Sequence, residues 1–268
     1  MTNETQTVLV TGASAGIGEE FARVFAINGH NLVLVARSKD KLTALARELR
    51  ETHGVTATVI AMDLAEPSAA GKLEAALERK RIAIDILVNN AGMALVGKFQ
   101  DVERDRHMAL LQLNVVTLTE LTHRLLGPMI ERGHGRILNV ASIVSFFPTP
   151  SFALYGASKA YVLSFSEALS QDLRGTGVTV TALCPGYTET SMISQGFADM
   201  GKEGLESKLP SLIKLTPAAV AREGYKACMK GKAVHVDRLS NDLAAQWIRL
   251  QPKWLVRNVG GLLARFAR

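Results

Sequence analysis

The sequence predicts an α/β fold in which a parallel sheet is covered by helices on both faces. Short aliphatic and β-branched runs alternate with helix-forming segments along the chain, which is typical of parallel strands joined by crossover helices. Near the N-terminus a strand-like run, a glycine-rich turn and a helix follow one another directly. The 268 residues contain no internal repeat and no interdomain linker. We therefore expect one catalytic domain over residues 1–238 and an extension over residues 239–268.

Charge and cysteine content exclude several classes of protein. The net charge of +6 is concentrated in residues 243–268, which hold five basic residues and no acidic one. The rest of the chain is nearly neutral, so we expect no nucleic-acid-binding surface on it. Cys184 and Cys228 suggest neither a disulfide framework nor a metal site, and the six histidines show no ligand spacing. These features favour a cytoplasmic protein without a bound metal.

No targeting or membrane-spanning segment is expected. Residues 1–6 are polar and lack the basic and apolar regions of a secretory signal. No run approaches the ~18 uninterrupted apolar residues of a transmembrane helix.

The first strand, residues 7–10, leads into a glycine-rich turn and then a helix that we expect to end near residue 28. Glycines let the backbone approach phosphate groups, and a helix N-terminus offers free N–H groups and a positive dipole end. A tight turn that requires positive φ is the other explanation for these glycines. The candidate contacts to a dinucleotide are Gly12, Ser14, Gly16, Ile17 and Gly18.

The second strand, residues 32–36, ends without the acidic residue that would bind a ribose 2′-OH. Arg37 follows instead, and an arginine fork suits a 2′-phosphate. A solvated loop charge is the alternative for Arg37. Ser38 is expected to cap a helix over residues 39–53, which Gly54 ends.

The third and fourth strands, residues 58–61 and 84–88, are separated by a helix over residues 67–80. Polar residues that follow parallel strands lie on the ligand side of the sheet. Asp63 can therefore accept a hydrogen bond from an adenine amine, or it can form a turn. After the fourth strand, small and amide residues permit close contact with a flat cofactor. From this group we select Asn89, Ala91 and Gly92.

A long helix is predicted over residues 105–129, with Asn114 in its middle. Asparagine is disfavoured inside a helix, so this amide lies either on a wet face or in a buried polar relay. The fifth strand, residues 135–141, has Ser142 at its carboxyl end. A loop over residues 143–154 follows. Its aromatic residues are Phe146, Phe147 and Phe152.

Tyr155 and Lys159 open a helix over residues 155–174. Residues four apart share a helix face, so the phenol and the ammonium are expected to point into the same space. A free phenol has a pKa of ~10, and a nearby cation lowers it. Such a tyrosine can give a proton to a carbonyl oxygen or take one from an alcohol. A surface tyrosine beside a solvated lysine is the ordinary alternative for this spacing.

The remaining elements complete the predicted sheet. A sixth strand over residues 178–184 ends at Pro185 and Gly186. Residues 187–216 are rich in glycine and apolar residues without clear periodicity, which indicates a functional or mobile loop. A helix over residues 217–229 and a seventh strand over residues 233–236 follow.

Together these motifs resemble the short-chain dehydrogenase/reductase family of the common single-domain type. The motifs occur in the family's order over roughly residues 5–236. The resemblance implies a seven-stranded, doubly wound Rossmann-type sheet and NADP(H) as cofactor in preference to NAD(H). Ala15 departs from the pattern, because many NADP-preferring members carry a second basic residue there. The implied further cofactor contacts are Tyr155, Lys159, Pro185, Gly186, Thr188 and Thr190.

The resemblance also implies catalytic roles for four residues. Ser142 would bind the substrate carbonyl oxygen, and Tyr155 would protonate it. Lys159 would lower the pKa of Tyr155 and hold the nicotinamide ribose, while Asn114 would anchor a water that links Lys159 to solvent. The chain is thus expected to be an NADPH-dependent carbonyl reductase that also works as an alcohol dehydrogenase, in a homodimer or homotetramer.

The substrate is expected to be apolar, because aromatic and aliphatic residues fill the loops over residues 143–154 and 187–216. Core packing or a subunit interface is the other explanation for these residues. Two other functions stay open. One is a non-catalytic NADP-binding regulator or scaffold, which the intact catalytic group argues against. The other is a membrane-surface protein that acts through its C-terminal tail.

The tail, residues 239–268, is not well covered by the resemblance. Leu243, Trp247, Leu250 and Trp254 recur at helical spacing with basic residues between them, and Pro252 divides the segment into two helices. A basic amphipathic helix with tryptophan fits a membrane surface. It also fits a helix that packs on its own subunit or on a neighbour, and packing is favoured because large exposed apolar stripes are rare on soluble monomers.

Overall fold

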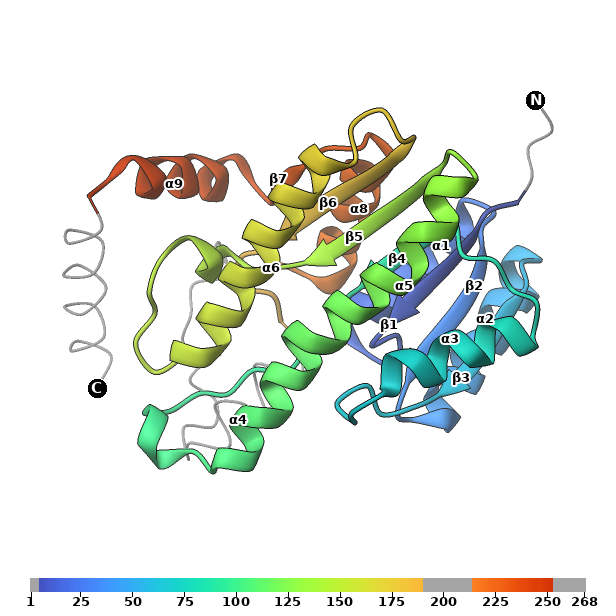
Figure 1. Cartoon of the computed structure of the whole chain (residues 1–268), viewed down its shortest axis with the longest axis horizontal. Helices are drawn as coiled ribbons and strands as arrows, with labels where there is room; N and C mark the ends of the chain where they lie inside the picture. Colours follow the sequence, from blue (N-terminus) through green and yellow to red (C-terminus); the bar gives the residue numbers. More distant parts are fainter. Residues whose placement is uncertain (1–4, 190–213, 253–268) are drawn as a thin grey trace.

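A computed structural model describes residues 5–189 and 214–252 of the chain. Seven parallel strands form one sheet in the order β3-β2-β1-β4-β5-β6-β7, with helices on both faces (Figure 1). The predicted doubly wound parallel sheet is confirmed. In chain order the strands are β1 Thr7–Thr11, β2 Asn31–Ala36, β3 Ala57–Ala61, β4 Ile86–Asn89, β5 Gly135–Val140, β6 Val178–Cys184 and β7 Val234–Val236.

The helices divide between the two faces of the sheet. One buried cluster joins the sheet to α1, α2 and α8, and two further clusters join the other face to α3, α5 and α6. The helices are α1 Gly16–Ile27, α2 Lys39–His53, α3 Ala69–Arg79, α4 Arg104–Leu111, α5 Leu118–Glu131, α6 Ala153–Asp172, α8 Pro217–Met229 and α9 Leu239–Leu250.

The strands are mainly aliphatic because both faces of the sheet are buried. Along β1, Val8 and Val10 enter the cluster under α1, whereas Leu9 enters the cluster under α3. β2 repeats this alternation, with Leu32 facing one layer and Val33 the other. The two-residue period of a strand thus distributes each aliphatic run over two separate cores.

The long helix predicted over residues 105–129 is interrupted in the structure. α4 ends at Leu111, a π-helical segment η2 spans Gln112–Thr117, and α5 begins at Leu118. Single π-helical turns inside α-helices are frequent at functional sites, because they widen the helix locally and redirect its side chains. Asn114 lies in this segment and is 1% exposed, so it belongs to a buried polar site and not to a wet face.

The strand order reverses between β1 and β4, which places a crevice at their carboxyl ends. Short 3₁₀ segments, η1 Phe99–Asp101 and η3 Ile143–Phe146, lie in the connections near this end. Within the two described stretches, every helix is too short or too polar to cross a bilayer.

Candidate active site

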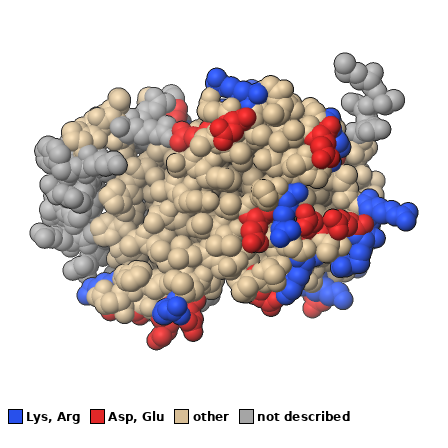
Figure 2. Space-filling model, in the orientation of Figure 1, with Lys and Arg blue, Asp and Glu red and all other residues tan. Residues whose placement is uncertain are grey.

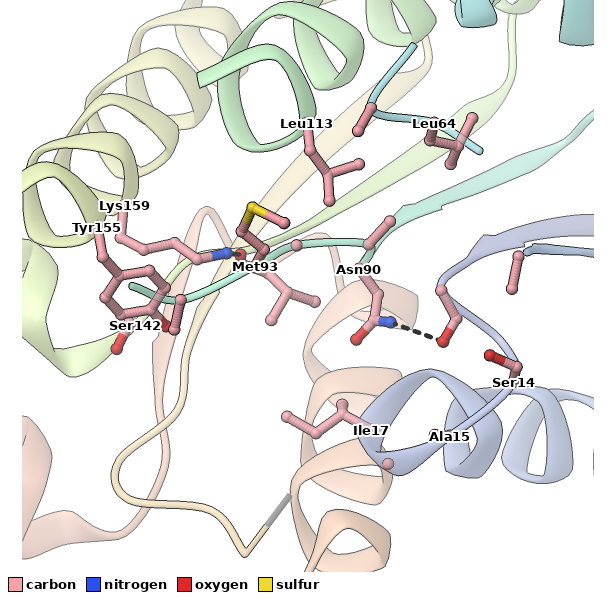
Figure 3. Close-up of a pocket in the computed structure, with 18 of the residues that line it drawn as sticks. Ser14, Ala15, Ile17, Leu64, Asn90, Met93, Leu113, Ser142, Tyr155 and Lys159 are labelled. Atoms are coloured by element: carbon pink, nitrogen blue, oxygen red, sulfur yellow. Dashed lines mark hydrogen bonds between the residues drawn. The ribbon is translucent and has the colours of Figure 1, made fainter. Parts of the chain in front are cut away.

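A cavity of about 500 Å³ opens at the carboxyl ends of β1 to β6. It collects most of the residues that the sequence predicted, and Figure 3 shows how ten of its lining residues lie. The predicted residues in its lining are Gly12, Ser14, Gly16, Ile17, Arg37, Asp63, Ala91, Gly92, Ser142, Tyr155, Lys159, Pro185, Gly186 and Thr188. Gly18, Asn89 and Asn114 are not part of the lining, and Thr190 lies outside the described residues.

The glycine-rich turn after β1 shapes one end of the cavity. Gly12 and Gly16 have φ values of 68° and 60°, a backbone conformation that residues other than glycine rarely adopt. Gly18 has a packing role, because a Cβ there would collide with the carbonyl oxygen of Gly12. The N-cap of α1 is Ala15, whose side chain accepts no hydrogen bond from the first N–H groups. Those N–H groups suit an anionic ligand.

Asn90 fixes the turn against the end of β4. Its Nδ2 donates to the carbonyl oxygens of Thr11, over 2.9 Å, and Gly12, over 3.4 Å, and the side chain projects toward the turn (Figure 3). The Thr11 Oγ1 accepts from the N–H groups of Asn90 and Ala91, each over 2.9 Å. Sequence reasoning chose Asn89 and passed over Asn90, although both belong to the same motif.

Asn89 points into the protein instead. It is 3% exposed, and its Nδ2 donates to Thr122 Oγ1 over 3.1 Å and to Asn139 Oδ1 over 2.9 Å. Asn139 in turn donates to Ser166 Oγ over 2.9 Å. Asn89 therefore joins β4 to α5 and β5 and, through Asn139, to α6, so it positions the end of β4 without reaching the cavity.

Arg37 and Asp63 stand at the ends of β2 and β3. The Arg37 side chain is 76% exposed, and its Nη1 lies 4.0 Å from Asp63 Oδ2. Asp63 Oδ1 also accepts a hydrogen bond from the N–H of Ala65 over 2.9 Å, so Asp63 forms a turn as well as lining the cavity. Ser38 occupies the N-cap position of α2 without making the predicted capping bond, and it lines the cavity.

Tyr155 and Lys159 project from α6 toward Ser142 at the other end of the cavity (Figure 3). The Lys159 Nζ lies 5.9 Å from the centre of the Tyr155 ring and donates to the carbonyl oxygen of Val140 over 2.7 Å. The Ser142 side chain lies next to the phenol (Figure 3), and its Oγ accepts a hydrogen bond from the N–H of Val144 over 3.3 Å. The predicted shared face of the helix is therefore present.

The predicted lowering of the Tyr155 pKa is wrong for this arrangement. Burial raises the pKa of the phenol, and the neighbouring Ser142 side chain opposes that rise only in part. The ammonium of Lys159 is directed at a backbone carbonyl, not at the phenol oxygen. Burial also lowers the pKa of Lys159 to about 8. Desolvation is thus the largest influence on the pKa of both groups.

Asn114 ties the catalytic helix to the loop after β4. Its Oδ1 accepts from the N–H of Met93 over 2.9 Å, and its Nδ2 donates to the Met93 carbonyl over 3.0 Å and to Ser158 Oγ over 3.1 Å. Ser158 donates to the carbonyl of Tyr155 over 2.7 Å. Both Nδ2 hydrogens of Asn114 and one lone pair of its Oδ1 are therefore used within the protein, and its role in anchoring a water stays a prediction.

Gly92 separates Asn114 from Lys159. A Cβ at this position would lie 3.3 Å from Asn114 Oδ1 and 3.6 Å from Lys159 Nζ. Any larger side chain would crowd both polar groups, which explains why glycine suits the position.

A family model described as short chain dehydrogenase matches residues 6–201. The chain belongs to this family. It is 31% identical to a 7beta-hydroxysteroid dehydrogenase of Collinsella aerofaciens, with 89% of each chain covered. It is 40% identical to a sulfoacetaldehyde reductase of Chromohalobacter salexigens over 69% of this chain and 74% of that one. A short-chain dehydrogenase of Sphingobium yanoikuyae, solved in complex with NADPH, has a TM-score of 0.81 and 34% identity, covering 97% and 95% of the two chains.

Sequence reasoning on this dehydrogenase missed Asp237, which stands one residue beyond β7. Its Oδ1 accepts hydrogen bonds from the N–H of Gly186 over 2.8 Å and from Asn241 Nδ2 over 3.2 Å. The side chain is buried, and burial raises the pKa of its carboxyl group. The available signal was its position, since an acidic residue directly after a parallel strand lies at the ligand side of the sheet.

Among the described residues, the aromatic side chains of the loop over residues 143–154 are not part of the cavity lining. Phe146 packs against the buried cluster around α6, and the Phe152 ring lies 6.1 Å from the Tyr155 ring. Most of the other loop, residues 190–213, lies outside the described residues, so its predicted part in the lining stays a prediction. Lining residues that the sequence did not single out are Met62, Leu64, Met93, Leu95, Arg106 and Leu113.

Proposed function

We propose that this dehydrogenase is an NADPH-dependent carbonyl reductase, reversible as an alcohol dehydrogenase, with Tyr155 as its general acid. One observation carries the proposal. A single cavity has an acid, a cation and a hydroxyl at one end, and a glycine turn with an arginine at the other. A binding module has no need of the first group, so a non-catalytic regulator or scaffold explains the cavity less well.

The residues at the far end of the cavity fit a dinucleotide phosphate. The N-terminus of α1 and the glycine turn would hold the pyrophosphate. Arg37 and Ser38 would bind the 2′-phosphate, because β2 ends in Ala36 and offers no carboxylate to a 2′-OH. Asp63 would accept a hydrogen bond from the adenine amine. The NADPH in the Sphingobium relative supports this assignment.

When bound, the nicotinamide supplies a hydride to the substrate carbon. Ser142 and Tyr155 both line the cavity and lie next to each other (Figure 3), so a carbonyl oxygen placed between them would meet two O–H donors. Burial keeps the Tyr155 phenol protonated at neutral pH, which is the form that an acid requires. Since the alkoxide formed on reduction is far more basic than a phenolate, the proton moves downhill even from a phenol with a raised pKa.

The protonated ammonium of Lys159 would place a positive charge near the Tyr155 phenol. Lys159 is 5% exposed, and its Nζ is held by the hydrogen bond to the carbonyl oxygen of Val140. Its ammonium stabilises the negative charge that forms on Tyr155 after proton transfer. The Asn114–Ser158 bridge holds the loop after β4 against the first turns of α6 and so keeps this group in register.

The proposed substrate is an apolar ketone, aldehyde or secondary alcohol. Met93 lines the same cavity as Tyr155 and Lys159 (Figure 3), and Leu95 and Leu113 add aliphatic surface to the lining. The names of the two relatives point in opposite directions, one to a hydroxysteroid and the other to sulfoacetaldehyde. The proposal of an apolar substrate therefore rests on the apolar lining of the cavity.

A substrate screen tests the proposed function. Ketones, aldehydes and acyl thioesters of increasing size are offered with NADPH, and the absorbance of NADPH is followed. We expect turnover with aliphatic and aromatic ketones. Binding of NADPH without oxidation by any carbonyl compound would instead favour a regulator or scaffold. Turnover restricted to small polar carbonyls would contradict the apolar substrate alone.

We further propose that the chain self-associates through the face formed by α5 and α6. Charged side chains are sparse over the middle of α6 (Figure 2), and the exposed large hydrophobic side chains include Ile130 on α5 and Tyr161 on α6. A homodimer or homotetramer would bury this area. Light scattering of the full chain checks this proposal, and a monomer at micromolar concentration would contradict it.

A further inference from the structure

The outer side of α9 is an apolar surface with no partner in the described part of the chain. The helix lies at the edge of the molecule, beyond β7 (Figure 1). Leu243, Trp247 and Leu250 are 57%, 60% and 82% exposed, and their spacing of four and three places them on one helix face. Among the other described residues, only Ile27 and Phe99 are large hydrophobics that exceed half exposure, and they stand singly.

The inner side of α9 is held against the protein, which keeps this apolar face turned outward. The Asn241 Nδ2 donates to Asp237 Oδ1 over 3.2 Å, and a side chain on Gly186 would meet Asn241 Nδ2 at 2.6 Å. The N–H of Asp242 donates to the Arg238 carbonyl over 3.1 Å. Rotation of the helix that buried Trp247 would break the Asn241 contact beside the cavity.

The charge of the following segment indicates what covers this face. After Asp242 the chain contains no acidic residue, and residues 253–268 carry Lys253, Arg257, Arg265 and Arg268. A symmetric contact between two copies through α9 would bring two such basic segments together. Residues 1–242 carry a net charge of only +1, so the rest of a second copy would attract the basic segment only weakly. An anionic surface complements both the apolar face and the basic segment.

We propose that α9 and the basic segment after it dock on an anionic lipid surface. Leu243, Trp247 and Leu250 enter the headgroup layer, where tryptophan is favoured, while the cations contact the lipid phosphates and carboxylates. Each basic residue near such a surface contributes roughly a fivefold gain in affinity. Because the inner side of α9 borders Gly186, docking places the cavity end of the dehydrogenase close to the membrane.

Vesicle flotation of the full chain tests this proposal. Vesicles of phosphatidylcholine alone are compared with vesicles that also contain phosphatidylserine, at low and high salt. We expect binding only to the anionic vesicles, and weaker binding at high salt. The variant Leu243→Ser/Trp247→Ser and the charge variant Lys253→Glu/Arg257→Glu should each reduce binding at least tenfold. The matched control is Ile27→Ser, which removes an equally exposed hydrophobic residue from α1 and should bind as the parent chain does.

Thermal unfolding and light scattering of each variant complete the test. The proposal is overturned if the folded chain does not bind anionic vesicles at either salt concentration. It is also overturned if the Leu243→Ser/Trp247→Ser variant still binds vesicles fully, or if that variant loses an oligomer that the parent forms without lipid. The last outcome would identify α9 as a contact between copies of the chain.

Discussion

Asp237 holds the backbone of Gly186: the carboxylate Oδ1 accepts a hydrogen bond from the Gly186 N–H over 2.8 Å. The two residues are 51 positions apart, and each lies just beyond the carboxyl end of one of two paired strands, β6 and β7. Asn241 donates to the same oxygen. One buried carboxylate therefore connects the floor of the cavity to the C-terminal helix.

We predict that Asp237→Ala raises the KM for NADPH several-fold and lowers the free energy of unfolding by ~1–3 kcal/mol, because the half-buried Gly186 N–H loses its acceptor. Asp237→Asn keeps an acceptor oxygen and should recover most of the affinity. Steady-state kinetics and thermal unfolding measure the two effects. Asp172→Ala, an exposed residue at the end of α6, is the control. Equal KM values for Asp237→Ala and the parent chain would show that the loop holds its shape without this bond.

Tyr155→Phe should abolish turnover and leave NADPH binding intact, since it removes the acid and keeps the ring. NADPH oxidation and a fluorescence titration separate the two properties. Tyr161→Phe is a matched control on the same helix, because the Tyr161 hydroxyl pairs with Thr119 Oγ1 over 2.8 Å, and Tyr161 is not part of the cavity lining. Near-normal turnover in Tyr155→Phe would falsify the assignment of the acid.

Arg37→Ala should weaken NADPH far more than NADH. A lost charged contact to a phosphate costs ~1.5–3 kcal/mol, which corresponds to roughly 10- to 150-fold in affinity. Titration of both nucleotides against the variant and the parent measures this difference. Arg47→Ala removes an exposed arginine from α2 and should change neither affinity. If the parent chain binds NADH and NADPH equally well, Arg37 does not select the cofactor.

The pH dependence of reduction should follow Lys159. Burial lowers its pKa to about 8, so the ammonium is present below that pH and is lost as the pH rises through it. We therefore expect kcat/KM for carbonyl reduction, which reports ionisations of the free enzyme, to be level at neutral pH and to fall above about pH 8. Initial rates between pH 6 and pH 10 test this expectation. A profile that stays level to pH 10 would show that the charge on Lys159 is not required.

Local sequence was sufficient to predict the elements of this fold. An aliphatic run such as β2 is stable only where helices cover both faces of the sheet. Gly54 ends α2 with a φ of 69°, which its lack of a Cβ allows. The glycine turn after β1 and the Tyr155–Lys159 pair were also predictable, because their geometry depends on neighbours within one turn or one helix.

Only the tertiary structure decided which polar groups face the cavity and what their surroundings do to them. Asn89 and Asn90 are adjacent in sequence, yet the alternation of β4 sends one into a buried network and the other to the glycine turn. Lys159 was expected to lower the pKa of Tyr155, but burial dominates, and burial depends on the atoms that surround the group from every side. The sequence determined the elements because propensity and periodicity are local properties. Contacts such as that between Asp237 and Gly186 depend on how distant strands pair, which no short segment of the chain contains.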